Sequence, residues 1–204
     1  MGDTKIIGIT GSYCAGKNYV ALLLEKRSFP VLDLDKLGHE VIEEEKPRLV
    51  SYFGEDILNS SGLVDRRKLG QKVFGKPKKL AALEEIIHPA VNVKTIEWIQ
   101  TRKEKACFIN AALLHRSSAF ELLDVLIIVR APLIVRLLRA KKRDRLSWVS
   151  LFKRFWSQRK FRYQFFSKNA DTYIVSNPFA CTTLGKRLEE RIDKILSLTG
   201  ITKV

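Results

Sequence analysis

Short apolar runs rich in isoleucine and valine alternate along the chain with longer stretches of helix-forming residues. Five such runs occur, at residues 5–10, 31–35, 106–110, 124–129 and 172–175. Each has the length and composition of a buried strand. Because such strands, separated by helical stretches, are typical of parallel sheets with helices on both faces, we predict an α/β fold with a five-stranded parallel sheet.

Two long interruptions divide the predicted strands. Residues 36–105 form a mostly helical insert, and residues 136–168 form a helical segment rich in basic residues. The remaining segments, residues 1–35, 106–135 and 169–204, then form the core of one domain. A chain of 204 residues has an ordinary size for a single domain with one substantial core.

The composition excludes several classes of protein. With 46% hydrophobic and 29% charged residues, the chain is neither disordered nor fibrous. The longest apolar stretch, residues 125–135, is interrupted by Arg130 and is shorter than the roughly 18 residues of a membrane-spanning helix. The N-terminus lacks the pattern of a secretory signal. Three dispersed cysteines, Cys14, Cys107 and Cys181, fit neither a disulfide framework nor a zinc site, so we expect a cytoplasmic protein.

The formal net charge of +15 is concentrated in one part of the chain. Residues 130–168 contain thirteen lysines and arginines and a single acid, Asp144, whereas the rest of the chain has 24 basic and 21 acidic residues. A basic cluster of this kind binds phosphates, whether on nucleic acid, an anionic membrane or a small polyphosphate. Charge alone leaves these three partners open.

The turn after the first predicted strand has the pattern of a phosphate-binding loop. Its sequence GSYCAGKN, at residues 11–18, fits Gly-x-x-x-x-Gly-Lys but has asparagine where serine or threonine is usual. Main-chain N–H groups and the positive end of the helix dipole bind phosphates in such a loop, and Lys17 adds a point charge. The residues expected to contact the nucleotide are Gly11, Ser12, Tyr13, Cys14, Ala15, Gly16, Lys17, Asn18 and Tyr19. The alternative is an ordinary strand-to-helix turn with a surface lysine.

Two features of this loop depart from the usual pattern. Serine or threonine at position 18 would place a hydroxyl oxygen on Mg²⁺, whereas Asn18 offers an amide oxygen on a longer arm. Because Mg²⁺ requires near-octahedral geometry, we expect a weaker or water-mediated metal contact at Asn18. Tyr13 and Cys14 make the loop bulkier, and a positive φ at Cys14 would cost about 1–2 kcal/mol.

Two carboxylates, Asp33 and Asp35, end the second predicted strand. In a sheet of this kind the second strand ends near the phosphate loop, so we expect one of the two to reach the phosphate site. A carboxylate there can accept a proton from an attacking hydroxyl or hold a metal-bound water. The alternative is an ordinary solvated strand end.

Arg136, Arg139 and Arg143 are spaced so that they form one stripe along a helix. Such a stripe can close over a triphosphate and neutralise the charge on a transferred phosphoryl group. The alternative is a solvated basic face. The helical segment of residues 136–168 is therefore a candidate lid.

Aromatic residues are interleaved with cations later in the candidate lid. These aromatics are Trp148, Phe152, Phe155 and Trp156. Stacking on nucleic acid or binding to a membrane surface is one interpretation of this pattern. We favour the other, in which the aromatics pack the lid against the sheet and the cations face ligand phosphates or solvent. We therefore expect neither a membrane nor a nucleic acid as partner.

Further fragments occur in a fixed order from Gly8 to about Leu196. In chain order they are GITG at 8–11, VLDLD at 31–35 with HEV at 39–41, FG at 53–54, GLVDRRKLG at 62–70 with VF at 73–74, IHP at 87–89, and Arg139, Arg143, Asp144, Arg154, Gln158, Ala170, Asp171 and Asn177. Taken together, and over almost the whole chain, these fragments resemble the dephospho-CoA kinase family.

The resemblance implies an activity and a fold. The activity is ATP-dependent phosphorylation of the 3′-hydroxyl of dephospho-CoA, giving CoA and ADP in the last step of coenzyme A biosynthesis. The fold implied is that of P-loop kinases similar to nucleoside-monophosphate kinases. The implied partners are two small molecules, ATP and dephospho-CoA, and the implied metal is Mg²⁺.

The resemblance also implies roles for individual residues. Asp35 would orient the ribose hydroxyl as the base, while Lys17 and Arg139 would stabilise the moving phosphoryl group. Arg143 would be a second cation of the lid, and Asn177 would lie near the adenine. The insert around Arg66 to His88 would form much of the CoA-side wall, with substrate contacts from Asp33, Asp35, Arg66 and His88.

The chain departs from the family pattern at several positions besides Asn18. Asn110 stands where an aspartate is often found, Arg136 stands where the lid usually has glutamine, and Ala112 and Arg116 replace the proline and the acid of a Pro-Leu-Leu-Phe-Glu segment. One alternative is a degenerate member that binds nucleotide without turnover, and another is a basic nucleic-acid-binding protein. We favour an active kinase, because the residues implied in catalysis are present.

Overall fold

The computed structural model describes most of the chain, namely residues 4–144, 147–157, 170–178 and 182–201. The chain divides into two compact units. The first unit comprises residues 1–32 and 101–204, and the second comprises residues 33–100. Among the described residues, no helix is both long and apolar enough to cross a bilayer.

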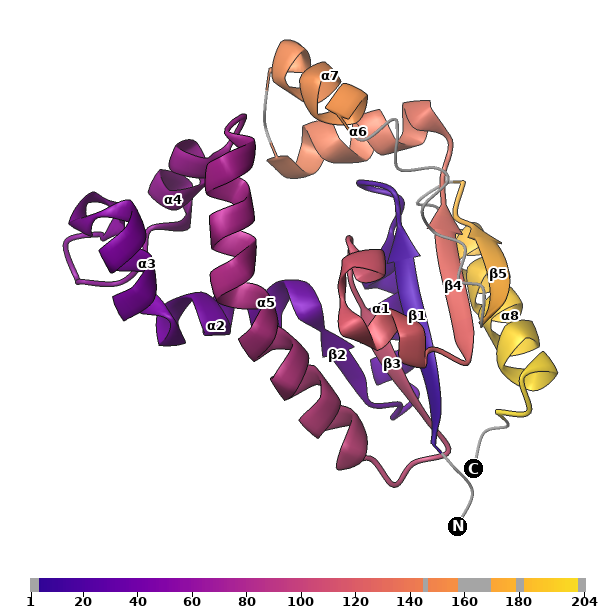
Figure 1. Ribbon diagram of the computed structural model, residues 1–204. Helices are drawn as coiled ribbons and strands as arrows, with labels where there is room; N and C mark the ends of the chain where they lie inside the picture. Colours follow the sequence, from indigo (N-terminus) through magenta and orange to yellow (C-terminus); the bar gives the residue numbers. More distant parts are fainter. Residues whose placement is uncertain (1–3, 145–146, 158–169, 179–181, 202–204) are drawn as a thin grey trace. The chain divides into compact units, whose positions relative to one another are not determined.

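The first unit is built on a five-stranded sheet with the strand order β2-β3-β1-β4-β5 (Figure 1). The strands are β1 (Lys5–Gly11), β2 (Val31–Asp33), β3 (Ala106–Asn110), β4 (Val125–Arg130) and β5 (Asp171–Ser176). β1 pairs in parallel with β3 and with β4, and β4 pairs in parallel with β5. The predicted α/β class and the parallel five-stranded sheet are confirmed.

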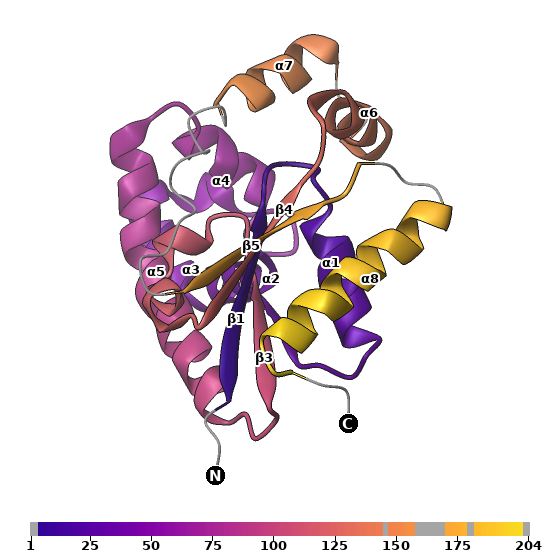
Figure 2. The same cartoon turned by 90° about the vertical axis from the view of Figure 1, so that its right-hand side faces the viewer.

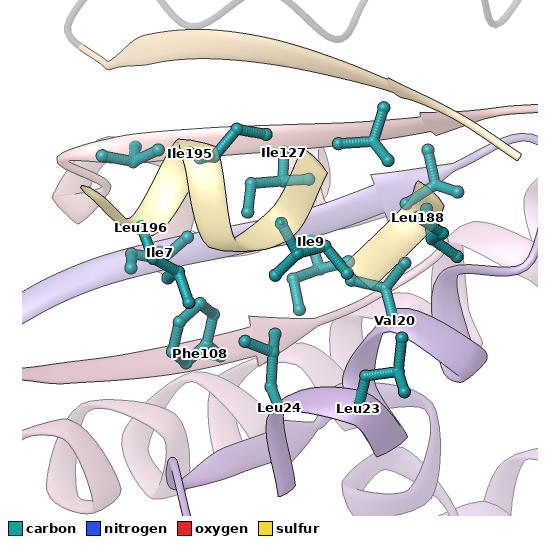
Figure 3. Close-up of a cluster of buried hydrophobic side chains, with 14 of the residues drawn as sticks. Ile7, Ile9, Val20, Leu23, Leu24, Phe108, Ile127, Leu188, Ile195 and Leu196 are labelled. Atoms are coloured by element: carbon teal, nitrogen blue, oxygen red, sulfur yellow. The ribbon is translucent and has the colours of Figure 1, made fainter. Parts of the chain in front are cut away.

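Helices α1 (Lys17–Glu25) and α8 (Thr182–Leu198) cover one face of this sheet, as Figure 2 shows. Alternate residues of β1 face them: Ile7 and Ile9 are almost fully buried in a cluster with side chains of both helices (Figure 3). Gly8 faces the other way, where a Cβ would lie 2.6 Å from Leu114 Cδ2. Two short 3₁₀ helices, η2 (Leu114–Arg116) and η3 (Ser118–Leu122), follow β3 on that side of the sheet.

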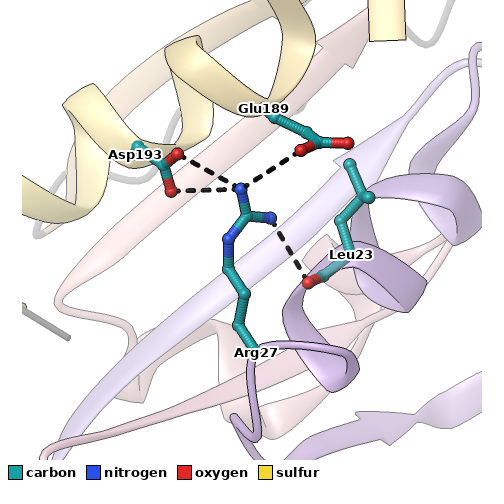
Figure 4. Close-up of polar contacts among 4 residues, drawn as sticks. All are labelled: Leu23, Arg27, Glu189 and Asp193. Atoms are coloured by element: carbon teal, nitrogen blue, oxygen red, sulfur yellow. Dashed lines mark hydrogen bonds and ion pairs between the residues drawn. The ribbon is translucent and has the colours of Figure 1, made fainter. Parts of the chain in front are cut away.

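An arginine joins the two helices that cover this face (Figure 4). Arg27 follows α1, and its Nη2 lies 3.2 Å from Asp193 and 3.8 Å from Glu189, which are four residues apart on α8. Its Nη1 donates to the carbonyl oxygen of Leu23 at 3.3 Å. Because both carboxylates are partly exposed to water, each pair stabilises the fold by about 0–1 kcal/mol.

The second unit is helical and has its own core. Its helices are α2 (Leu34–Glu44), α3 (Lys46–Phe53), the 3₁₀ helix η1 (Glu55–Ile57), α4 (Arg66–Val73) and α5 (Pro77–Gln100). Apolar side chains from each of them are buried together, including Val41, Leu49, Ile57, Leu69 and Ile86. Asp65 begins α4 as its N-cap and accepts hydrogen bonds from the main-chain N–H groups of Arg67 and Lys68. An aspartate cap of this kind satisfies N–H groups that have no partner within the helix.

The second strand is shorter than the sequence pattern predicts. β2 ends at Asp33, and Leu34 and Asp35 already belong to α2, so the prediction of a strand over residues 31–35 is wrong at its end. The Asp33 carboxylate accepts hydrogen bonds from the main-chain N–H groups of Asp35 at 3.0 Å and Lys36 at 3.2 Å. Asp33 is thus the N-cap of α2, and Asp35 lies in the first turn of that helix.

The candidate lid begins with two helices of the first unit. They are α6 (Leu133–Asp144) and α7 (Trp148–Ser157), drawn in salmon and in orange in Figure 1. Leu151 on α7 and Ala140 on α6 are fully buried. The lysines and arginines of α6 and α7 are therefore carried by helices that also bury apolar side chains.

Candidate phosphate-binding site

The backbone φ angle changes sign along the loop between β1 and α1. Cys14 has a φ of +58° and Gly16 a φ of +104°, whereas Ala15 between them has a negative φ. The Ala15 N–H donates to the carbonyl oxygen of Ser12 at 2.9 Å and closes a tight turn. Alternation of this kind directs successive N–H groups into one concavity that binds anions. Cys14 does adopt the positive φ considered above, at a cost of about 1–2 kcal/mol.

Both glycines of the motif are required by close contacts, and Gly16 is also required by its conformation. A Cβ at Gly16 would lie 2.2 Å from Nδ2 of Asn177, and a Cβ at Gly11 would lie 2.5 Å from the carbonyl oxygen of Val129. Gly16 is the N-cap of α1. The N-terminus of α1, with its positive dipole end, therefore begins directly at the loop.

Lys17 lies next to two side-chain amides. Its Nζ donates to Oδ1 of Asn18 at 2.9 Å and to Oδ1 of Asn110 at 3.4 Å, and Nδ2 of Asn110 donates to Oδ1 of Asn18 at 3.2 Å. Asn110 ends β3, the neighbour of β1, and is almost fully buried. The two positions that depart from the family pattern near the expected metal are therefore in contact with each other and with the ammonium group.

Asn18 and Asn110 also provide side-chain oxygens that can bind a divalent cation beside the loop. Amide oxygens are suitable ligands for Mg²⁺, which keeps several waters and takes its other ligands from phosphate oxygens. Among the described residues, no cluster of three or more histidines, cysteines or carboxylates surrounds the loop or any other point. The donor set of Asn18 and Asn110 fits a Mg²⁺ ion bound largely through water and phosphate.

Two residues from distant parts of the chain bond to the carbonyl side of the loop. Nη1 of Arg139 donates to the carbonyl oxygens of Cys14 at 3.4 Å and Ala15 at 3.1 Å, and Nδ2 of Asn177 donates to the Ala15 oxygen at 2.9 Å. Nη2 of Arg139 donates to Oδ1 of Asn177 at 3.2 Å. Burial lowers the pKa of the Arg139 guanidinium from its ordinary value, but arginine remains charged at neutral pH.

The other two arginines of the stripe contact Tyr13. Nε of Arg136 donates to the Tyr13 carbonyl oxygen at 2.8 Å, and the Arg143 guanidinium lies 5.1 Å from the centroid of the Tyr13 ring. Arg143 also pairs with Asp144 at 2.7 Å, and the Tyr13 hydroxyl donates to the same carboxylate. All three arginines therefore lie on the face of α6 that is directed at the loop, as their spacing indicates.

The aromatic residues of α7 divide into two sets. The Phe155 ring packs edge-to-face on Tyr13 at 5.3 Å and lies 4.9 Å from the Arg136 guanidinium. Trp148 and Phe152, by contrast, are 47% and 58% exposed, so the prediction that they pack against the sheet is wrong. The apolar face of α7 is broader than the part of it that makes contact: Leu151 is fully buried and Phe155 packs on Tyr13, whereas Trp148 and Phe152 lie at the edge of the same face and are exposed. Gln158 and the side chains of Arg154 and Trp156 lie outside the described residues.

The remaining predicted site residues belong to the second unit. Asp33 and Asp35 lie at the start of α2, where Asp33 is the cap. Arg66 is the first residue of α4, and its Nη1 lies 2.7 Å from Nδ1 of His39. His88 lies within α5, next to Pro89. The pairing of Arg66 with His39 was not expected, although both residues belong to the fragments singled out in the sequence.

Comparison with known proteins identifies relatives over nearly the full length. The family model described as dephospho-CoA kinase matches residues 5–177. A protein of Treponema pallidum named dephospho-CoA kinase is 32% identical over 206 residues, which cover 96% of both chains. One from Treponema denticola with the same name is 31% identical over 200 residues, which cover 93% of this chain and 89% of the relative.

Solved structures agree with the family match. A Thermus thermophilus protein superposes with a TM-score of 0.77 at 29% identity, covering 96% of this chain and 98% of that one. The dephospho-CoA kinase from Campylobacter jejuni superposes with a TM-score of 0.64 at 25% identity, covering 95% of this chain and 98% of that one. The similarity therefore extends to the whole fold.

Proposed function

The chain belongs to the dephospho-CoA kinase family, and on this premise we propose how its residues transfer the γ-phosphoryl group of ATP to the 3′-hydroxyl of dephospho-CoA. The protein is a kinase of coenzyme A biosynthesis and catalyses its final step, which yields CoA and ADP. One observation carries this conclusion: the family match runs from β1 through the phosphate loop and the lid arginines to Asn177. We also propose that the protein is located in the cytoplasm.

In this proposal the loop binds the ATP phosphates. The N–H groups of residues 12–17 and the N-terminus of α1 face the β- and γ-phosphates, and the Lys17 ammonium neutralises their charge. Mg²⁺ bound there would offset the negative charge of the triphosphate. Asn18, with Asn110 beside it, would hold this ion largely through water.

Asp35 is the proposed base for the acceptor. The 3′-hydroxyl of dephospho-CoA donates its proton to the Asp35 carboxylate as the oxygen attacks the γ-phosphorus, and ADP leaves. Asp33 holds the main chain of the same turn through its cap bonds and contributes to the substrate side. Arg66, His88 and the helical insert of residues 36–105 form the proposed CoA-side wall, with Arg66 as a cation for the substrate phosphates.

The lid supplies positive charge beside the loop. Arg139 lies closest to the main chain of residues 14–15, and Arg143 extends from α6 over the Tyr13 ring. In the transition state these guanidinium groups would offset the charge that spreads over the transferred phosphoryl oxygens. Asn177, at the end of β5, borders the part of the site proposed for the adenine.

The contribution of residue 18 to metal binding is testable. Replacing Asn18 with serine should lower the Mg²⁺ concentration for half-maximal rate by about tenfold, equivalent to about 1.4 kcal/mol of metal binding, because a hydroxyl oxygen suits the ion better. Rates of ADP release across a Mg²⁺ titration at saturating ATP would measure this. Asn18→Ala is the control that removes the oxygen and should not lower the requirement. An unchanged requirement in the serine variant would place residue 18 away from the ion.

The proposed function is tested by identifying the product. The protein should release ADP from ATP only when Mg²⁺ and dephospho-CoA are both present, and the second product should be CoA by mass spectrometry. A panel of nucleosides in place of dephospho-CoA should give no comparable turnover. Stabilisation by ATP without acceptor-dependent turnover would instead indicate a nucleotide-binding protein that has lost catalysis. Salt-dependent binding to duplex DNA that is unchanged in the Lys17→Ala variant would indicate a nucleic-acid-binding protein.

A further inference from the structure

The carbonyl side of the phosphate loop is held by side chains that enter from outside the motif. Arg139 and Asn177 donate hydrogen bonds to the carbonyl oxygens of Cys14 and Ala15. Asn177 is 162 residues from Ala15 in the chain and only 8% exposed. The two side chains are also bonded to each other, since Arg139 Nη2 donates to Oδ1 of Asn177 at 3.2 Å and to its carbonyl oxygen at 3.3 Å.

Asn177 is itself held in place by the sheet. Its main-chain N–H donates to the carbonyl oxygen of Arg130 at 2.7 Å, at the end of the pairing between β4 and β5. Both polar atoms of its side-chain amide form hydrogen bonds within the protein: Nδ2 donates to the carbonyl oxygen of Ala15, and Oδ1 accepts from Arg139. The amide therefore links the rigid end of the sheet to the loop, and Gly16 leaves the space through which it approaches.

The loop needs such support at one particular residue. Cys14 is held at a φ of +58°, a conformation that glycine adopts freely and that a residue with a Cβ rarely adopts. The hydrogen bonds from Arg139 and Asn177 fall on Cys14 and on the residue that follows it. When the carbonyl oxygens are fixed on one side of these peptide units, their N–H groups point to the other side, where phosphates bind.

We propose that Arg139 and Asn177 are positioning residues, which keep the strained Cys14–Ala15 segment in its phosphate-binding conformation by holding its carbonyl oxygens. The role deepens the proposed function and rests on it, because the conformation matters only if the loop binds phosphates. This role differs from direct contact with the nucleotide, because the two side chains affect nucleotide binding through the main chain of the loop. It follows that their contribution to nucleotide binding depends on residue 14.

A double-mutant cycle tests this dependence. With Cys14 present, Asn177→Ala should weaken binding of a non-hydrolysable ATP analogue, adenosine 5′-(β,γ-imido)triphosphate, by about 5–30-fold, the factor that corresponds to the conformational strain at one residue. With Cys14→Gly present, the same Asn177→Ala change should weaken binding by less than about threefold, because glycine adopts the conformation without support. Isothermal titration calorimetry with Mg²⁺ present gives both affinities.

Ser28 provides a matched control for the glycine substitution. It is the other described non-glycine residue with a positive φ, at +63°, and it lies beyond the far end of α1 from the loop. In a protein that carries Ser28→Gly, Asn177→Ala should therefore still cause the full loss of affinity for the ATP analogue. Arg139→Lys, which keeps the charge but not the paired bonds, should lose affinity in the Cys14 protein and recover it with Cys14→Gly.

The outcomes separate a positioning role from the alternatives. An equal loss of affinity with and without the Cys14→Gly substitution would overturn the proposal and assign Asn177 a direct contact with the nucleotide. Recovery by Ser28→Gly as well as by Cys14→Gly would overturn it too, because the effect would then be general stabilisation, and melting temperatures of all variants would show this. Since the cycle measures binding alone, a chain that binds the analogue but does not phosphorylate dephospho-CoA would contradict only the proposed function.

Discussion

Replacing Lys17 with alanine should lower the rate of dephospho-CoA phosphorylation by at least about 10³-fold, the effect of removing a charge that stabilises a transition state. The Lys17 ammonium is the one cation of the loop motif itself, and it lies at the start of α1 beside Asn18 and Asn110. The substitution removes no buried apolar contact, so the melting temperature should change little. Acceptor-dependent release of ADP is the measurement.

The same helix offers a control for this substitution. Lys26 is the exposed C-cap residue of α1, at the opposite end from the loop. Lys26→Ala removes the same charge from the same helix and should leave the rate within about twofold, because exposed charges distant from the site are screened by water and salt. A Lys17→Ala protein that kept a tenth or more of the wild-type rate would contradict the role assigned to the ammonium group.

Asp35→Asn should lower kcat by about 10²–10⁴-fold, the contribution of a general base. Asparagine keeps the size of the side chain and its place in the first turn of α2 but cannot accept the proton. Steady-state kinetics with dephospho-CoA as the varied substrate would separate this loss of kcat from any change in KM.

Asp33→Asn is the matched comparison for Asp35. An asparagine caps a helix about as well as an aspartate, so the bonds to the N–H groups of Asp35 and Lys36 should persist. The Asp33 variant should therefore retain a rate much closer to wild type than the Asp35 variant does. If the two substitutions caused equal losses, or if Asp35→Asn left kcat unchanged, Asp35 would not be the base.

The local pattern of apolar and polar residues was sufficient to predict most of the fold. The strands at the centre of the sheet, β3, β1 and β4, are short and mostly apolar runs that are largely buried, a pattern typical of a parallel sheet covered on both faces. The second strand was predicted too long because Asp33 and Asp35 were both interpreted as strand residues. The signal for a helix was present, since an aspartate followed by helix-forming residues is an N-cap pattern.

The site was predictable where its residues are neighbours in sequence. The loop with Asn18 and the spacing of the lid arginines follow from short motifs, whereas Asn110 was singled out through the resemblance to the kinase family. The contact between Asn18 and Asn110 depends on the adjacency of β1 and β3, and the bonds of Asn177 to the loop depend on the position of β5 in the sheet. Packing likewise decides which residues on the apolar face of α7 make contact. Phe155 lies against Tyr13, whereas Phe152 is exposed.

A crystal structure with adenosine 5′-(β,γ-imido)triphosphate and Mg²⁺ examines the phosphate loop most directly. The β- and γ-phosphates should lie within the turn of residues 11–17, hydrogen-bonded by main-chain N–H groups at the start of α1 and by Lys17 Nζ. Electron density for the analogue elsewhere on the protein, with no phosphate in this turn, would contradict the account.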